Sequence, residues 1–209
     1  GALVRKAYEN FNPRNPAAIL PELAAVRNLL SEADQSEYWV QQKLQEIDDI
    51  MLYCAGIWME ANTTRPVFAA NDTFRYQIEI LKRSNVEVFL TDIRENGRSL
   101  GLTDTLDANR EVQEYPFVVP GPHAITQPYW FANQTPAGVY EVGDKQAWIG
   151  MPTNPAPLEI TVELDISGVT ISKTLPITHR YVDRAVGELY RPVVIAPPLT
   201  VNVSEPVYL

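Results

Sequence analysis

The hydrophobic period of the chain changes once, near residue 63, and this change limits the folds available to it. Residues 1–62 carry apolar side chains three or four positions apart, which indicates amphipathic helices. From residue 64 onward apolar and polar residues alternate, as in half-buried strands. We therefore expect an α+β protein, in which an antiparallel helical unit of about three helices (1–62) packs on an antiparallel Ig-like β-sandwich (64–209).

The third expected helix has the clearest apolar stripe. It begins near Asp34–Ser36 and ends in "EANTTRP", about residue 62. The stripe consists of Val40, Leu44, Ile47, Met51, Ala55 and Trp58. We expect Trp39 and Trp58 to lie in the core, together with Cys54 as a small buried hydrophobic residue.

Two hairpins are predicted in the β region. One covers 73–93, and a stronger one covers 158–177 around the two-residue turn Ser167–Gly168. Weaker strand candidates are 66–70, 111–119, 137–142, 146–149, 189–195 and 199–204. Residues 188–209 either close the sandwich or begin a following module, and the sequence leaves both open.

Composition excludes several classes of partner. The net charge is −9 and the pI is near 4.7, with no Lys/Arg cluster longer than two, so we expect neither nucleic acid nor an anionic membrane surface as a partner. No apolar run approaches the roughly 20 residues of a membrane span, so no membrane insertion is expected. Cys54 is the single cysteine, which excludes an internal disulfide and a thiolate metal cluster.

No motif for catalysis or metal binding is present. The two histidines, His123 and His179, form no zinc-binding spacing, and there is no Walker loop and no G-x-S-x-G elbow. The acidic residues near Asp48 and those in "HRYVDRAVGE" read as solvated or ion-paired groups. We therefore predict no catalytic residue, no metal ligand and no cofactor in this chain, although a stand-alone hydrolase assembled in space remains an alternative.

One stretch could bind a ligand: "PHAITQPYWFANQTPAG", residues 122–138. The candidate ligand-binding residues are Tyr129, Trp130, Trp148 and His123, because exposed Trp and Tyr rings can stack on sugar faces. The competing interpretation is that the Tyr129–Trp130 pair fixes a crossing segment in the core. Exposure of the Trp130 indole to water would separate the two.

The order of segments resembles the region downstream of the catalytic domain in large bacterial PIG-L (LmbE-like) de-N-acetylases. The resemblance covers nearly the whole chain. It rests on "NPRNPAAILPELAAVRNLL", "KLQEIDDIMLYCAGIWMEA", "RYQIEILKRSNVEVFLTDI", "TQPYWF", "GVYEV", "IGMPTNPAPLEITVELDISG" and "YVDRAVGELYRPVVIAPPLTV".

The resemblance implies that this chain is a non-catalytic part of a larger enzyme. The family's catalytic domain binds zinc through an A-H-P-D-D-E type motif and deacetylates N-acetylglucosaminyl substrates, but no "HPDD" occurs here and neither histidine matches a ligand position. Zinc would belong to that other domain, and the expected partner is the catalytic domain of the same polypeptide. A periplasmic or secreted parent is favoured. The alternative is a carbohydrate-binding module that uses the aromatics of the β region.

Overall fold

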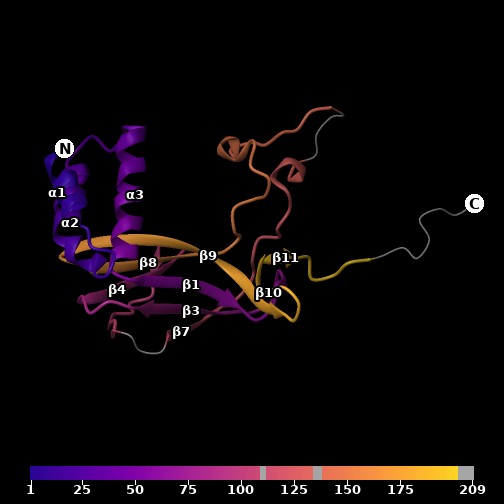
Figure 1. Cartoon of the computed structure of the whole chain (residues 1–209). Coiled ribbons are helices and arrows are strands. Elements are labelled where there is room, and N and C mark those ends of the chain that lie inside the picture. The colour runs from indigo at the N-terminus through magenta and orange to yellow at the C-terminus, as the bar shows by residue number, and fades with distance from the viewer. Residues whose placement is uncertain (109–111, 134–137, 202–209) are drawn as a thin grey trace, which may run out of the picture. The chain divides into compact units, whose positions relative to one another are not determined.

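A computed structural model describes residues 1–108, 112–133 and 138–201 (Figure 1). Helices come first and strands follow, so the predicted α+β class is confirmed. The helices are α1 Ala2–Asn10, η1 Pro16–Ile19, α2 Leu20–Ser31, α3 Tyr38–Cys54, η2 Tyr129–Phe131 and η3 Gln146–Trp148, where η marks a 3-10 turn. The strands are β1 Ile57–Thr63, β2 Val67–Ala69, β3 Phe74–Lys82, β4 Val88–Glu95, β5 Arg98–Ser99, β6 Asp104–Thr105, β7 Gln113–Val119, β8 Glu159–Ile166, β9 Val169–Asp183, β10 Gly187–Pro192 and β11 Val194–Ala196.

The chain forms two compact units. The first unit consists of residues 1–61, 77–115 and 159–176, and the second of residues 62–76, 116–158 and 177–209. The first therefore contains all three α-helices together with strand segments. The boundary falls inside β1, β3, β7 and β9, and the predicted division into domains at residues 62–64 stays a prediction.

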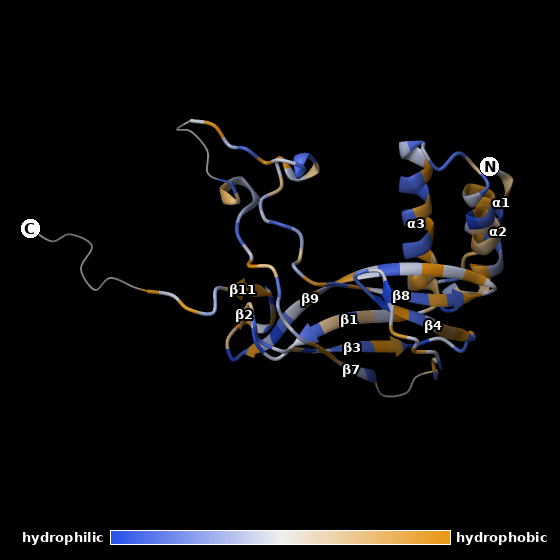
Figure 2. Cartoon of the chain, turned by 180° about the vertical axis from the view of Figure 1, so that it is seen from behind, coloured by the Kyte–Doolittle hydropathy of each residue, from blue (hydrophilic) through white to orange (hydrophobic). Residues whose placement is uncertain are grey.

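The three α-helices of the first unit bury only part of the apolar pattern that the sequence indicated, since Val4, Leu29 and Ile50 stay exposed. The hydrophobic side of α3 is turned toward α1 and α2 (Figure 2), and it buries Ile47, Met51 and the single Cys54, as predicted. An ion pair joins α2 to α3, with 2.9 Å from Arg27 Nε to Asp48 Oδ1.

The predicted third helix is too long at its C-terminal end. It ends at Cys54, and Gly56 follows with a left-handed φ of +66°, a conformation that terminates helices. Residues 57–63 then form strand β1.

The two tryptophans assigned to the helical core are also exposed: Trp39 by 69% and Trp58 by 39%. Because α3 begins only at Tyr38, Trp39 lies in its first turn, and Trp58 takes an outward position of β1.

The β8–β9 hairpin is confirmed. Its two strands pair in continuous antiparallel register from Ile166↔Val169 to Glu159↔Pro176. The turn residues Ser167 and Gly168 both have positive φ, at 57° and 77°, as two-residue hairpin turns of the primed type require. Ile160, Val162, Leu164 and Ile166 are buried on one face, while their neighbours along the strand are more exposed.

The predicted hairpin over 73–93 is wrong, although both of its strands exist. The sheet order is β5-β4-β8-β9-β1-β3-β7, so β3 lies between β1 and β7. β4 pairs instead with β8, from Val88↔Ile166 to Glu95↔Ile160. The alternating pattern identified each strand, but the short link between them did not determine their partners.

The sheet is mixed, so an antiparallel sandwich is not confirmed. β1 and β9 are neighbours and run in the same direction (Figure 1), which is possible because a long stretch of chain separates them. A second, two-stranded sheet pairs β11 with β2 in parallel, from Val194↔Val67 to Ala196↔Ala69.

In the second unit, residues 187–196 are integral to the fold. β10 pairs with the end of β9, from Gly187↔Asp183 to Pro192↔Thr178. Thr126 binds Ile195 through two bonds of 2.9 Å, because its N–H donates to the Ile195 carbonyl and its Oγ1 accepts from the Ile195 N–H. The segment "HRYVDRAVGE" is therefore largely a hairpin.

Several weak strand candidates are corrected. Among the described residues, 138–142 and 199–201 form no strand, and 146–148 form the 3-10 turn η3. The prediction for 202–204 lies outside the described residues. Proline and glycine are frequent in these stretches, and both interrupt the pairing of a strand.

Candidate functional site: an aromatic pocket within residues 120–158

The described part of residues 120–158 contains no strand and only the turns η2 and η3. Seven prolines in this stretch limit backbone pairing. The Asn154 side chain supplies hydrogen bonds that strand pairing would otherwise make. Its Oδ1 accepts the Tyr129 backbone N–H at 2.9 Å, and its Nδ2 donates to the Gln127 carbonyl at 2.6 Å. Side-chain hydrogen bonds thus hold together segments that are 25 residues or more apart in sequence.

Tyr129 is the centre of an aromatic cluster. Only 7% of it is exposed, and its ring meets Trp130 and Trp148 edge to face, with centroids 4.9 and 6.2 Å away. Its hydroxyl accepts the Gly150 N–H at 3.2 Å. Edge-to-face contacts of this kind stabilise aromatic clusters beyond their buried area.

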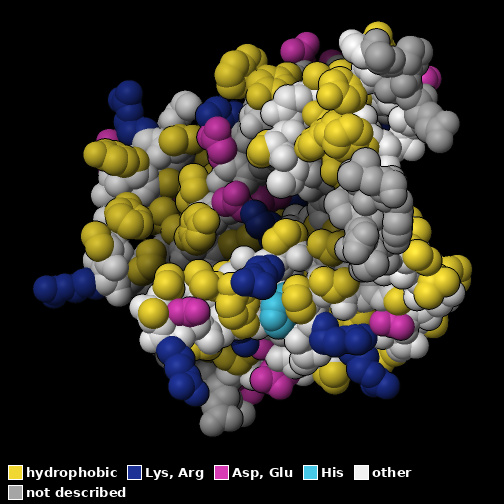
Figure 3. Space-filling model, turned by 90° about the vertical axis from the view of Figure 1, so that its right-hand side faces the viewer, with side chains coloured by type: hydrophobic (Ala, Val, Ile, Leu, Met, Phe, Trp, Pro, Cys, Tyr) yellow, Lys and Arg dark blue, Asp and Glu magenta, His cyan; other side chains and the backbone are white. Residues whose placement is uncertain are grey.

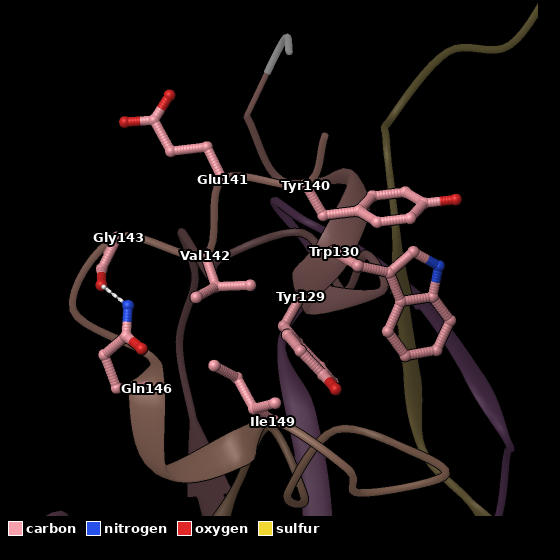
Figure 4. Close-up of a pocket in the computed structure, with 8 residues that line it drawn as sticks. All are labelled: Tyr129, Trp130, Tyr140, Glu141, Val142, Gly143, Gln146 and Ile149. Carbon is pink, nitrogen blue, oxygen red and sulfur yellow. Dashed lines mark hydrogen bonds between the residues drawn. The ribbon is translucent and has the colours of Figure 1, made fainter. Parts of the chain in front are cut away.

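A cavity of about 580 Å³ opens beside this cluster. Its lining residues are Tyr129, Trp130, Tyr140, Glu141, Val142, Gly143, Gln146 and Ile149. In Figure 4, Tyr129, Val142 and Ile149 face the hollow, with Trp130 and Tyr140 along one side, and the Glu141 carboxylate points away. The Gln146 side chain donates to the Gly143 carbonyl at 3.2 Å.

The rings around this cavity reach the solvent. Trp130 and Trp148 are half-buried, and Tyr140 is 64% exposed. The competing interpretation required the indole of Trp130 to lie in the core. Because this indole is only half-buried, that requirement is not met. Aromatic faces, a carboxamide and backbone carbonyls form a surface of low charge, which can bind a ligand by ring contacts and neutral hydrogen bonds.

Three of the four predicted ligand residues lie in this cluster. Tyr129 and Trp130 line the cavity, and Trp148 contacts Tyr129 while Lys145 Nζ lies 5.1 Å from the centroid of its ring. Tyr140 and Ile149 were missed as site residues because both fell in stretches assigned to strands.

His123 does not join the cluster. Its ring packs edge-on against Phe74, with centroids 6.3 Å apart, and its backbone N–H donates to the Ala70 carbonyl at 2.7 Å. Gly121 permits this close approach of the chain, because a Cβ there would lie only 2.9 Å from the same Ala70 carbonyl oxygen.

The other candidates for acid–base chemistry have structural contacts. Asp49 pairs with Lys173 and Glu46 with Lys43, and Arg180 lies 3.9 Å from Glu188. His179 places Nδ1 2.9 Å from the Thr63 carbonyl and stacks on Tyr181. Among the described residues, no three His, Cys, Asp or Glu side chains come together to hold a metal ion.

One face of the molecule carries its cations in separate groups. On the face drawn in Figure 3, Lys and Arg side chains (dark blue) are divided by hydrophobic and acidic ones. No helix in the described part of the chain is both long enough and apolar enough to cross a membrane.

Comparison with known proteins assigns no family. No family model and no curated protein matches the chain. Among solved structures, it is similar to the CARDB domain of a Pyrococcus furiosus protein in complex with di-metal ions, with 8% identity, 58% of this chain and 88% of that chain covered, and a TM-score of 0.30. It is also similar to the Pseudomonas fluorescens alkylpurine DNA glycosylase AlkC bound to DNA containing an abasic site analog, with 9% identity, coverage of 78% and 46%, and a TM-score of 0.29. Similarities this low carry no argument about fold or function.

Proposed function

We propose that this chain is a non-catalytic accessory region of a larger PIG-L-like, zinc-dependent N-acetylglucosaminyl deacetylase. In this role it binds the catalytic domain of the same polypeptide and positions it. The order of sequence segments supports the assignment to this family. The observation that carries the docking role is an apolar groove on the helices of the first unit.

The groove lies between α1, α2 and α3 and has a volume of about 700 Å³. Leu3, Val4, Val26, Leu29, Ile47 and Ile50 are among the residues that line it. Leu29 is 58% exposed, and Val4 and Ile50 are also exposed. A contiguous apolar surface of this kind is typical of a site that another protein surface covers.

The catalytic domain is the occupant that we propose. In the family that the sequence resembles, this domain lies N-terminal to the resembling region, and here the N-terminal residues Gly1 and Ala2 line the groove. The charged lining residues Lys43 and Glu46 form an ion pair of 2.7 Å and neutralise each other. The groove thus favours an apolar surface over a charged one.

The test compares this chain with the full polypeptide from which it comes. We expect acetate release from an N-acetylglucosaminyl substrate by the full polypeptide only, and slower amide hydrogen exchange of α1 and α2 there than in this chain alone. Leu29→Lys should abolish that protection, because it places a charge in the apolar groove. The matched control is Tyr53→Lys, which changes an exposed residue of α3 outside the groove.

Two results would contradict the proposal. Equal exchange of the groove helices in both proteins would remove the docking role. Acetate release by this chain alone would favour the hydrolase alternative instead.

A second candidate is a carbohydrate-binding module, and the open aromatic pocket of residues 120–158 favours it. This stretch contains five aromatic side chains but only three charged ones, which suits a neutral sugar better than an ionic ligand. The half-buried Trp130 and the exposed Tyr140 present ring faces beside Gln146. The sugar would stack on these rings through its C–H groups.

Titration of tryptophan fluorescence with chitin oligomers and peptidoglycan fragments tests this candidate. Tyr140→Ala should weaken binding by about tenfold, the equivalent of roughly 1.4 kcal/mol, because one ring contact is lost. Trp39→Ala changes an exposed tryptophan of α3 and serves as the control. Equal affinities of the two variants would exclude the pocket as the binding site.

The Ig-like assignment of the β-rich region belongs to the same proposal, in which this region is the spacer.

A further inference from the structure

A second polar hollow lies in the first unit, apart from the groove. It has a volume of about 450 Å³. The link between α1 and η1 lines it on one side, and the residues that follow β3 line it on the other. The two arginines among its lining residues, Arg14 and Arg83, come from these two different segments.

The charge of this hollow is opposite to that of the protein. Its lining residues include both arginines and no carboxylate, whereas the whole chain has a net charge of −9. Some other arginines are paired with acids, as Arg27 is with Asp48. Among the described residues, neither Arg14 nor Arg83 forms an ion pair with the chain's own acids. Both guanidinium groups can therefore donate hydrogen bonds to an external anion.

Neutral donors accompany the two cations. The Ser84 hydroxyl oxygen accepts the Val86 N–H at 3.3 Å, which leaves its proton for another acceptor. The carboxamides of Asn15 and Asn85 also line the hollow, and Asn15 makes no capping bond to η1. Guanidinium, amide and hydroxyl groups together match the several oxygens of an oxyanion.

The backbone positions of both arginines are fixed. The Arg83 N–H donates to the Gly56 carbonyl at 2.9 Å, and the Arg14 N–H donates to Asn12 Oδ1 at 3.0 Å. Gly56 allows this approach, since a Cβ there would lie 3.2 Å from the Ser84 nitrogen and its φ is +66°. Both side chains start from fixed backbone positions and are exposed, so their guanidinium groups can turn toward a ligand in the hollow.

We propose that this hollow binds a small anionic ligand through a phosphate, sulfate or carboxylate group held between Arg14 and Arg83. Guanidinium groups bind such oxyanions through two parallel hydrogen bonds. The volume lies in the range of small-molecule sites and exceeds that of a bare anion. The remainder of the ligand therefore lies against Pro16, Ala17 and Val86, which line the same hollow.

Titration of the intact chain with inorganic phosphate, and separately with citrate, tests the site. Both titrations are followed by backbone amide NMR at constant ionic strength set with sodium chloride. We expect saturable shifts confined to residues 14–17, 54–56 and 83–86. Stronger binding of phosphate would indicate that the anionic group of the ligand is a phosphate or sulfate. Stronger binding of citrate would indicate a carboxylate.

Arg83→Gln keeps most of the length of the side chain and removes its charge, so we expect it to fold and to bind about tenfold more weakly. Arg14→Gln should behave in the same way. The control, Arg5→Gln, changes an exposed arginine of α1 outside the hollow and should bind as the parent does. Shifts that do not saturate, or equal losses in Arg5→Gln and Arg83→Gln, would overturn the proposal, and both results are independent of the accessory role.

Discussion

The β8–β9 hairpin and residues 120–158 hold their shapes by opposite means. In the hairpin, backbone pairs repeat from Ile166↔Val169 to Glu159↔Pro176, and every second side chain of β8 is buried. In residues 120–158 a few side chains hold the segments together instead, above all Asn154 and the Tyr129 ring. Stability in the hairpin is therefore distributed over many contacts, whereas the aromatic pocket depends on single residues and leaves ring faces open to a ligand.

The largest expected effect comes from the buried face of the hairpin. Leu164 is 1% exposed and lies between its partners Leu90 and Ile171. Leu164→Ala should lower the free energy of unfolding by about 3 kcal/mol, because it removes buried area and leaves a cavity. Urea unfolding measures this, with Glu159→Gln on the exposed side of β8 as the control. A decrease of less than about 1 kcal/mol in the free energy of unfolding would show that this face of the hairpin is not close-packed.

Asn154→Ala should act locally and sharpen the contrast. It removes the acceptor of the Tyr129 N–H and the donor to Gln127, at a cost of about 2 kcal/mol to the local structure. Amide hydrogen exchange should accelerate for residues 127–131 while the β8–β9 amides keep their protection. Acceleration in both regions would mean that the pocket and the hairpin open as one cooperative element.

The same difference explains what the sequence could predict. Alternation within 159–177 indicated both the strands and their buried face, and the pair Ser167–Gly168 indicated their connection. For β3 and β4 the pattern indicated the strands but not the partners, since alternation describes one strand and pairing depends on segments about 70 residues away. Tyr140 was assigned to a strand over 137–142, because no periodic pattern marks a ring that lines a cavity from a loop.

A test of the hairpin turn has a smaller expected effect. Gly168 has a φ of +77° and faces open space, so Gly168→Ala meets no neighbouring atom and the cost is that of the backbone conformation alone. We expect a loss of about 1 kcal/mol in unfolding free energy, measured by thermal unfolding. Ser167→Gly relaxes the adjacent residue at φ 57° and should not destabilise to that extent. If Gly168→Ala has no effect, the turn does not have the left-handed geometry on which the register depends.

The smallest expected effect concerns pH at the end of the same long strand. The Ala185 and Val186 N–H groups donate to the Asp183 carboxylate at 2.8 and 3.0 Å, and these bonds hold its pKa below the ordinary value of 3.8. Because the pKa is lower in the folded protein, the contribution of this turn is complete above pH 3.8 and is lost as the pH falls through the folded-state value. NMR titration should show the Ala185 and Val186 amides shifting with a midpoint below 3.8. Asp183→Asn retains an oxygen acceptor but cannot titrate, so it should abolish that shift and leave the turn in place. If the shift persists in Asp183→Asn, another group titrates there. The Asp183 side-chain bonds would then not account for the pH response of this turn, in contrast to the role of the Asn154 side chain around Tyr129.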